Sequence, residues 1–212
     1  MVCYLAHMVR FSLCFLLLGA AALAQPPTQG DRDYTVSALQ ATRKEFLDIL
    51  VQVTPAQWNW KPAPNVWSIA EVAEHITAAE TFFPQVAKKA MAGPAEPDKK
   101  KPNPRQTDEM LMKMVPARDR KFQAPEPIQP KSRFATKAEL VVEFKKDRDA
   151  NIAYIRETSD SLRDHFAPNP AVGELDALQW YTFMAAHTER HLNQIRELEA
   201  NPQFPKSGAS AH

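Results

Sequence analysis

The stretch QWYTFMAAHTERHLNQI, residues 179–195, decides the fold of this 212-residue chain. Its large apolar residues, Trp180 and Phe183 among them, recur at spacings of three and four, which place side chains on one face of an α-helix. His187 and His191 fall on the same stripe, because residues four apart lie only about 40° from each other around a helix. The stretch therefore predicts a helix that buries two histidines against a core.

Capping signals and apolar periodicity predict three more long helices. The segment Ser68-Ile69-Ala70-Glu71 is a capping box that opens a helix to about residue 91, and Thr136-Lys137-Ala138-Glu139 opens another to about residue 158. Apolar residues at helical spacing predict a first helix over about 34–53, and Thr54-Pro55 starts a short helical turn after it. The last helix is expected over about 176–199. With no convincing strand, the fold class is all-α, a four-helix bundle with a long Pro-rich crossover connection.

The N-terminus predicts export. Residues 11–18 are apolar, and the small-residue run that follows ends in Ala22-Leu23-Ala24, so residues 1–24 are interpreted as a signal peptide cleaved after Ala24. The expected location is periplasmic or secreted. The apolar run is too short to serve as a stable membrane anchor. Both cysteines, Cys3 and Cys14, lie in the segment to be removed, so the mature chain is expected to have neither a disulfide nor a thiol nucleophile.

The remaining residues divide into a bundle and its flanks. Residues 25–33 are expected to form a loose tether, residues 34–200 the bundle, and residues 201–212 a flexible tail. Residues 93–131 hold 8 of the chain's 18 prolines and are expected to be a crossover connection, mobile or draped over the bundle, with one helix near 107–115. The mature chain has balanced basic and acidic residues, which offers no electrostatic footprint for nucleic acid.

His75 joins the two histidines of the last helix as a candidate ligand. It lies on the apolar side of the helix that follows Ser68. Buried imidazoles need polar partners, and either ordinary core hydrogen bonds or a shared metal ion would supply them. Three imidazoles would leave a coordination position open, as in catalytic rather than structural zinc sites. Nitrogen ligands suit Zn, Ni, Fe or Cu better than Mg or Ca.

The residues around the candidate ligands are open to more than one interpretation. The pair is not the H-E-x-x-H of metalloproteases, because Glu189 is two residues after the first histidine and points away from it. Glu189 and its neighbour Arg190 are expected to be charges on the solvent face. Glu71 and Gln194 share faces with the histidines and could orient an imidazole or a bound water, but Glu71 is also explained by its capping box. The sequence identifies no general base.

Two blocks of sequence resemble the DinB-like family of four-helix bundles (the DinB/YfiT group). Residues 67–76 are similar to its helix opening W-S-I-x-E-V-x-x-H-I, and Gly173-Glu174-Leu175 with residues 187–195 are similar to its closing pattern G-x-L … H-x-x-x-H-x-x-Q-I. In that family three histidines bind a divalent metal, commonly zinc or nickel. The resemblance implies that the metal ligands here are His75, His187 and His191, with water completing the coordination.

The resemblance also implies a function, with an alternative. Some relatives are metal-dependent transferases or isomerases that use low-molecular-weight thiols, so an exported metal-dependent enzyme acting on a small molecule is expected. Export would separate the protein from reduced thiol cofactors, which makes hydrolysis by a metal-activated water a competitor. The alternative is a non-catalytic bundle that binds a metal or ligand, or whose histidines are structural. The substrate is not identified, and a homodimer formed by helix packing is one candidate assembly.

Overall fold

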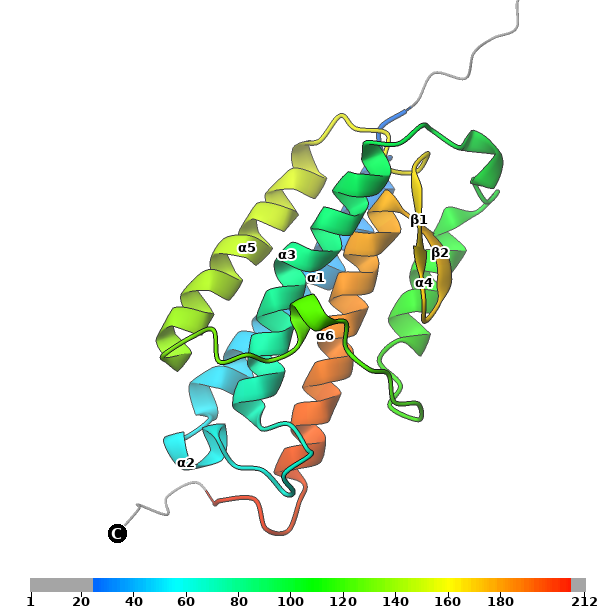
Figure 1. Cartoon of the computed structure of the whole chain (residues 1–212). Helices are drawn as coiled ribbons and strands as arrows, with labels where there is room; N and C mark the ends of the chain where they lie inside the picture. The colour runs from blue at the N-terminus through cyan, green and yellow to red at the C-terminus, as the bar shows by residue number, and fades with distance from the viewer. Residues whose placement is uncertain (1–24, 207–212) are drawn as a thin grey trace, which may run out of the picture.

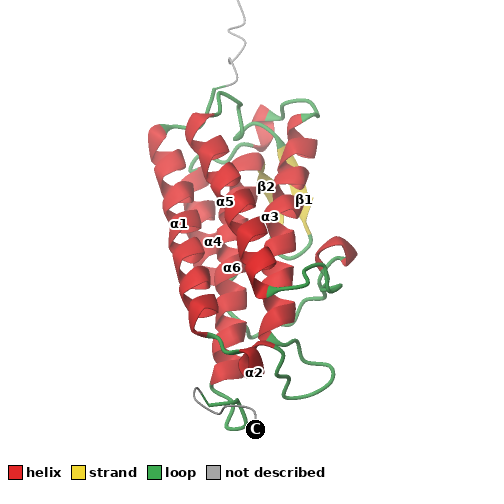
Figure 2. Cartoon of the chain, turned by 90° about the vertical axis from the view of Figure 1, so that its left-hand side faces the viewer, coloured by secondary structure: helices red, strands yellow, loops and turns green. Residues whose placement is uncertain are grey.

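The computed structural model describes residues 25–206 and shows a bundle of four long helices with shorter elements around it (Figures 1 and 2). α1 and α3 each pack against both α5 and α6, so α1 and α3 are diagonal to each other in the bundle. The predicted all-α four-helix bundle is confirmed. Within residues 25–206, no helix is both long and apolar enough to cross a membrane. The long helices are α1 (Gln29–Gln52), α3 (Ile69–Met91), α5 (Lys137–Glu157) and α6 (Ala177–Glu199).

Side-chain caps fix where the helices begin. The Ser68 hydroxyl accepts from the backbone N–H of Glu71, and the Glu71 carboxylate accepts from the backbone N–H of Ser68 at 2.7 Å, which is the predicted capping box of α3. A similar box opens the short helix α2 (Pro55–Trp58) at Thr54. The box predicted for α5 is only half formed. Thr136 caps the helix, but the Glu139 carboxylate accepts from the N–H of Ala135 instead.

The predicted tether is wrong over residues 29–33, which belong to α1. The helix begins early because Thr28 and Asp31 form a capping box in which aspartate takes the place of the usual glutamate. Arg32 anchors this first turn, since its guanidinium donates to the backbone oxygens of Ile155 and Thr158 at the end of α5. The predicted signal peptide, residues 1–24, lies outside the described residues.

The predicted flexible tail is wrong over residues 201–206, which pack beside α2. The Phe204 ring lies 5.4 Å from the Trp60 ring, edge to face, and the backbone oxygen of Pro205 accepts from the Gln57 side chain at 2.8 Å. An aromatic residue near the end of a polar segment thus finds a partner in the loop after α2. Residues 207–212 are not among the described residues.

A small hairpin corrects the expectation of no strand. β1 (Phe166–Asn169) and β2 (Gly173–Asp176) pair antiparallel, and β2 runs directly into α6, whose N-cap is Asp176. Gly173 has a φ of +86°, a conformation that side-chain-bearing residues adopt only with strain. Each strand has only four residues, and Pro168 interrupts the alternation that would have identified β1.

The Pro-rich connection is draped over the bundle, one of the two expected forms. It contains the 3-10 turns η1 (Pro97–Lys99) and η2 (Glu126–Ile128) and the helix α4 (Pro104–Met114), which packs against α6. After α4 the chain crosses in front of α6 and α3 on its way to α5, with η2 at the crossing (Figure 1). This crossing covers the middle of the bundle, where the candidate ligands lie.

A buried polar layer separates two apolar clusters along the bundle axis. On α3 one cluster takes residues 69–76 and the other residues 79–87, and a comparable break falls on α6 between residues 185 and 192. Next to the break, the fully buried Arg148 of α5 donates to both Glu80 oxygens of α3 at 2.7 and 2.6 Å. It also donates to the hydroxyls of Thr42 on α1 and Thr188 on α6, both at 2.9 Å. One side chain from each long helix therefore meets at one height, and this layer fixes how the helices are aligned.

Candidate metal centre

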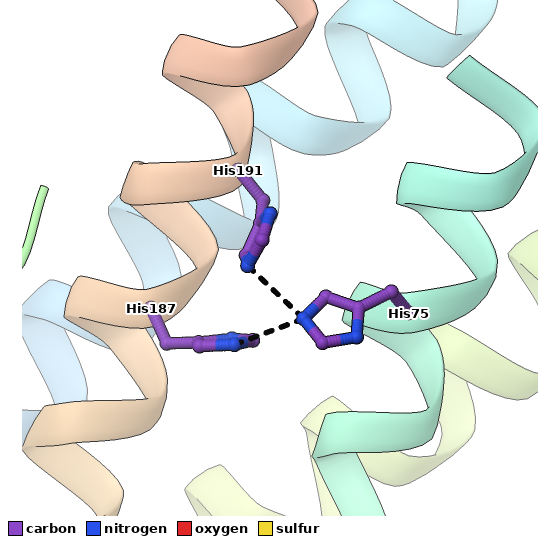
Figure 3. A group of neighbouring side chains, drawn as sticks. All are labelled: His75, His187 and His191. Atoms are coloured by element: carbon purple, nitrogen blue, oxygen red, sulfur yellow. Dashed lines mark hydrogen bonds between the residues drawn. The ribbon is translucent and has the colours of Figure 1, made fainter. Parts of the chain in front are cut away.

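The three predicted ligands meet near this layer, between α3 and α6, with His187 directly before Thr188 in the sequence. The Nε2 atom of His75 lies 3.1 Å from Nε2 of His187 and 3.0 Å from Nε2 of His191 (Figure 3). All three side chains are buried, and each offers a ligand atom within 4.8 Å of the others. The i,i+4 spacing puts two rings on one face of α6, and helix packing brings the third ring to them from α3.

Hydrogen bonds on the far side of two rings determine which nitrogen carries the proton. The Nδ1 atom of His75 lies 2.7 Å from the backbone oxygen of Ile128, which can only accept, so Nδ1 is the protonated nitrogen. The Nδ1 atom of His191 lies 2.8 Å from Oε1 of Gln194. Arg118 donates to the same Gln194 oxygen at 3.4 Å, which supports this orientation of the amide. Both rings therefore direct an unprotonated Nε2 to the centre.

These protonation states leave nitrogen lone pairs at the centre without a hydrogen-bond donor. Two Nε2 lone pairs 3.0 Å apart, those of His75 and His191, have no hydrogen between them. His187 can donate one proton at most, and its own Nδ1 has no hydrogen-bond partner among the described residues. A cation would accept all three lone pairs at once. Imidazole nitrogens on a tetrahedral zinc ion lie about 3.3 Å from each other, so small adjustments of the rings would accommodate it. The donor set fits a divalent metal.

Burial keeps the three rings in the neutral form that a metal needs. It lowers the pKa of His75 to about 4, an effect that the hydrogen bond to Ile128 opposes and the charge of Arg133 reinforces. Burial also lowers the pKa of His187 and His191 well below the ordinary value, and the neighbouring imidazoles lower both further. At neutral pH the lone pairs are consequently available without competition from protons.

Aromatic rings flank the histidines on both sides. The Trp67 ring lies 5.0 Å from the His75 ring and 6.5 Å from the His191 ring. On the other side, Phe83 lies 5.0 Å from His187 between their ring centres. These walls are apolar, which lowers the local dielectric and strengthens any interaction between a cation and its ligands.

The two polar residues proposed to orient a ligand have different roles. Gln194 contacts His191 directly and sets its orientation, as one of the two interpretations had it. Glu71 serves its capping box and forms an ion pair with Lys61 at 2.9 Å, so the simpler interpretation holds for it.

Arg190 is not on the solvent face, and that expectation was wrong. It is buried, and its guanidinium donates to the backbone oxygens of Val115, Ala117 and Arg120 in the connection after α4. Glu189 is half-buried and pairs with Arg196 at 3.1 Å. The helix-face argument failed here because a distant segment covers what would otherwise be an exposed side of α6. The contact from Ile128 to His75 was also missed. It is made by a backbone oxygen, which every residue has, so the residue type does not indicate it.

Comparison with known proteins places the chain in a family. The model of the DinB superfamily matches residues 38–195, well over half of the chain. The chain is 24% identical over 164 residues to the uncharacterized protein YuaE of Bacillus subtilis (strain 168), an alignment covering 77% of this chain and 96% of that protein. It is also similar to the crystal structure of TT2238, a four-helix bundle protein, with 19% identity and a TM-score of 0.47 over 78% of this chain and 98% of that one. The chain belongs to the DinB superfamily.

Proposed function

We propose that this protein is a metal-dependent enzyme that holds one divalent ion, zinc or nickel, through His75, His187 and His191. The observation that carries the proposal is that three Nε2 atoms converge while the Nδ1 atoms of His75 and His191 hold the ring protons in other hydrogen bonds. The converging lone pairs of these two rings therefore have no hydrogen between them. Three protein ligands leave a position for water or substrate, which favours catalysis over a purely structural site.

The chemistry belongs to the class in which a bound metal lowers the pKa of a water or thiol and so provides a nucleophile at neutral pH. The residues of the chain hold the site in shape for it. The Ile128 carbonyl and Gln194 fix the two rings that they contact. Trp67 and Phe83 keep bulk water from the two sides that they cover.

Thiol-dependent transfer to a small molecule is the first candidate reaction. Among the described residues, no carboxylate hydrogen-bonds to the three histidines, and the side-chain charges that act on them belong to the neighbouring imidazoles and to arginines. A site without an adjacent base suits a thiol, because its ordinary pKa of about 8.5 needs little lowering before the thiolate forms. The thiol would come from outside the bundle, since both cysteines lie within residues 1–24.

Hydrolysis is the second candidate, and the N-terminal sequence favours it. We propose that residues 1–24 direct export to the periplasm or the medium, where reduced thiols are scarce and water is the available nucleophile. Comparing the N-terminus of the protein from its native host with that of the encoded chain would test export. A mature chain that begins at Gln25 is expected, and an uncleaved N-terminus in the cell extract would contradict it.

Elemental analysis of protein purified without an affinity tag tests the metal site. About one zinc or nickel per chain is expected, and the double variant His75→Ala/His187→Ala should lose it. The matched control is His165→Ala, which removes another buried histidine that lies outside the site. Metal retained by the double variant would refute the ligand assignment. No metal in the wild type, even after zinc or nickel is added back, would favour the non-catalytic bundle with structural histidines.

A further inference from the structure

Residues 115–133, called here the strap, are fastened to α6 on one side of the metal centre. Arg190 donates to three backbone oxygens of the strap, those of residues 115, 117 and 120. The Asn193 side chain donates to the backbone oxygen of Pro116 at 3.2 Å. Arg118 of the strap donates to Glu197 at 2.8 Å and to Gln194, the residue that orients His191. The strap therefore reaches one candidate ligand through a single intervening side chain.

The strap is fastened to α3 on the opposite side of the centre. The buried carboxylate of Glu74 accepts from three successive backbone N–H groups, those of Lys131, Ser132 and Arg133, at 2.7, 3.0 and 3.2 Å. It also accepts from the Arg133 side chain at 2.8 Å. Ser132 has a φ of +56°, which is unfavourable for a residue with a side chain. The Glu74 carboxylate thus stabilises a turn that the strap would not adopt readily by itself.

Between its fastenings the strap is mostly exposed, with one buried contact at the centre. Residues 119–123 are exposed, and Phe122 keeps 58% of its surface accessible. Ile128 is only 2% exposed, and its backbone oxygen accepts a hydrogen bond from Nδ1–H of His75. Two of the three candidate ligands are consequently linked to the strap, His75 directly and His191 through Gln194.

We propose that closure of the strap and metal binding stabilise each other, an inference that rests on the metal site proposed above. A cation on Nε2 of His75 withdraws electron density from the ring, which makes Nδ1–H a stronger donor to Ile128. The same holds for His191 and Gln194, whose oxygen Arg118 also contacts. Coupling between two equilibria is reciprocal, so a strap held closed raises metal affinity by the factor by which metal favours closure.

Limited trypsin digestion of the full protein tests the coupling, because the strap carries its own cleavage sites. Arg118, Arg120 and Lys121 lie in the strap, while Lys99 and Lys100 lie in the same connection but before α4. Cleavage that tracks the open population reports the closing equilibrium. With zinc bound, cleavage at residues 118–121 is expected to be about tenfold slower than in the chelated protein, a coupling within the usual range. Cleavage at Lys99 and Lys100, identified by mass spectrometry, should not change.

A pair of variants on one helix separates the strap from helix stability. Glu74→Ala removes the α3 fastening and is expected to weaken zinc affinity about tenfold and to abolish the protection by zinc. Glu71→Ala removes the capping carboxylate of the same helix without touching the strap, and should keep wild-type affinity and protection. Circular dichroism would show whether each variant is folded.

The outcomes distinguish this inference from the proposed function. Wild-type protein that binds zinc but is cleaved in the strap equally fast with and without it would refute the coupling and leave the metal site standing. Wild-type zinc affinity in folded Glu74→Ala would refute it as well. If Glu74→Ala does not fold, the digestion of the wild type decides alone. Wild-type protein that binds no zinc would overturn both proposals.

Discussion

Acidification should destabilise the metal-free protein through His75. The loss in free energy of unfolding depends on how far burial lowers the pKa of this ring. The pKa of this ring falls from the ordinary value of 6.5 to about 4 in the folded state. Between these values the unfolded chain binds a proton that the folded chain does not, so the free energy of unfolding rises with pH. The stabilisation is complete above about pH 6.5 and is lost as the pH falls toward 4. At about 1.36 kcal/mol per pH unit, the loss amounts to about 3 kcal/mol.

The assay is urea unfolding of the wild type and of His75→Leu, both with chelator, at several values from about pH 7.5 to about pH 4. Leucine fills similar space and does not titrate. The other titratable groups are common to both proteins, and among the three histidines only the part of the pKa lowering of His187 and His191 that comes from His75 is lost with it. The difference in unfolding free energy, wild type minus variant, should fall by about 3 kcal/mol over this range. A difference that stays constant with pH would mean that the pKa of His75 is the same in the folded and the unfolded chain. The argument that the site presents neutral imidazoles would then fail.

Three further predictions concern the polar layer, the metal site and the hairpin. Glu80→Ala should lower the free energy of unfolding by about 3–5 kcal/mol, because it leaves the Arg148 charge buried without its counter-ion; a loss below about 1 kcal/mol in urea unfolding would contradict this. Gln194→Ala should weaken zinc binding about 10- to 100-fold in a competition assay with a chelating dye, since His191 loses its orienting acceptor; unchanged affinity would remove Gln194 from the site. Gly173→Ala should cost about 1 kcal/mol, measured by urea unfolding, because its φ is +86°; a stabilised variant would refute the strain argument.

Local sequence rules were enough to locate the long helices and the two candidate ligands of α6. The Ser68 box and the apolar stripe around His187 and His191 depend on residues within one or two turns of each other, so they can be interpreted without knowing the rest of the fold. His75 needed more, because nothing local joins it to a helix more than a hundred residues later. Its buried face made it a candidate but left ordinary core hydrogen bonds open as an alternative, and the family resemblance then implied the shared metal ion. The structure then brought its Nε2 to the other two.

The features that were missed all depend on distant contacts or on the backbone. Arg190 has the sequence context of an exposed charge and is buried only because the strap passes over it. Ile128 contributes a carbonyl, which every residue has, so its identity gave no indication. Thr28 and Asp31 were local and could have been recognised, had aspartate been accepted in the second position of the box.

Trp67 gives the protein an optical reporter of its own site. Its half-buried indole lies 5.0 Å from the ring of His75 and 6.5 Å from the ring of His191, two of the three candidate ligands. A paramagnetic ion such as Ni²⁺ or Cu²⁺ at this distance quenches indole emission, while the closed-shell Zn²⁺ does not. Titration of one ion against the other would therefore follow occupancy and exchange in real time, in an unlabelled protein, with Trp67→Phe as the reference for the emission of the other three tryptophans.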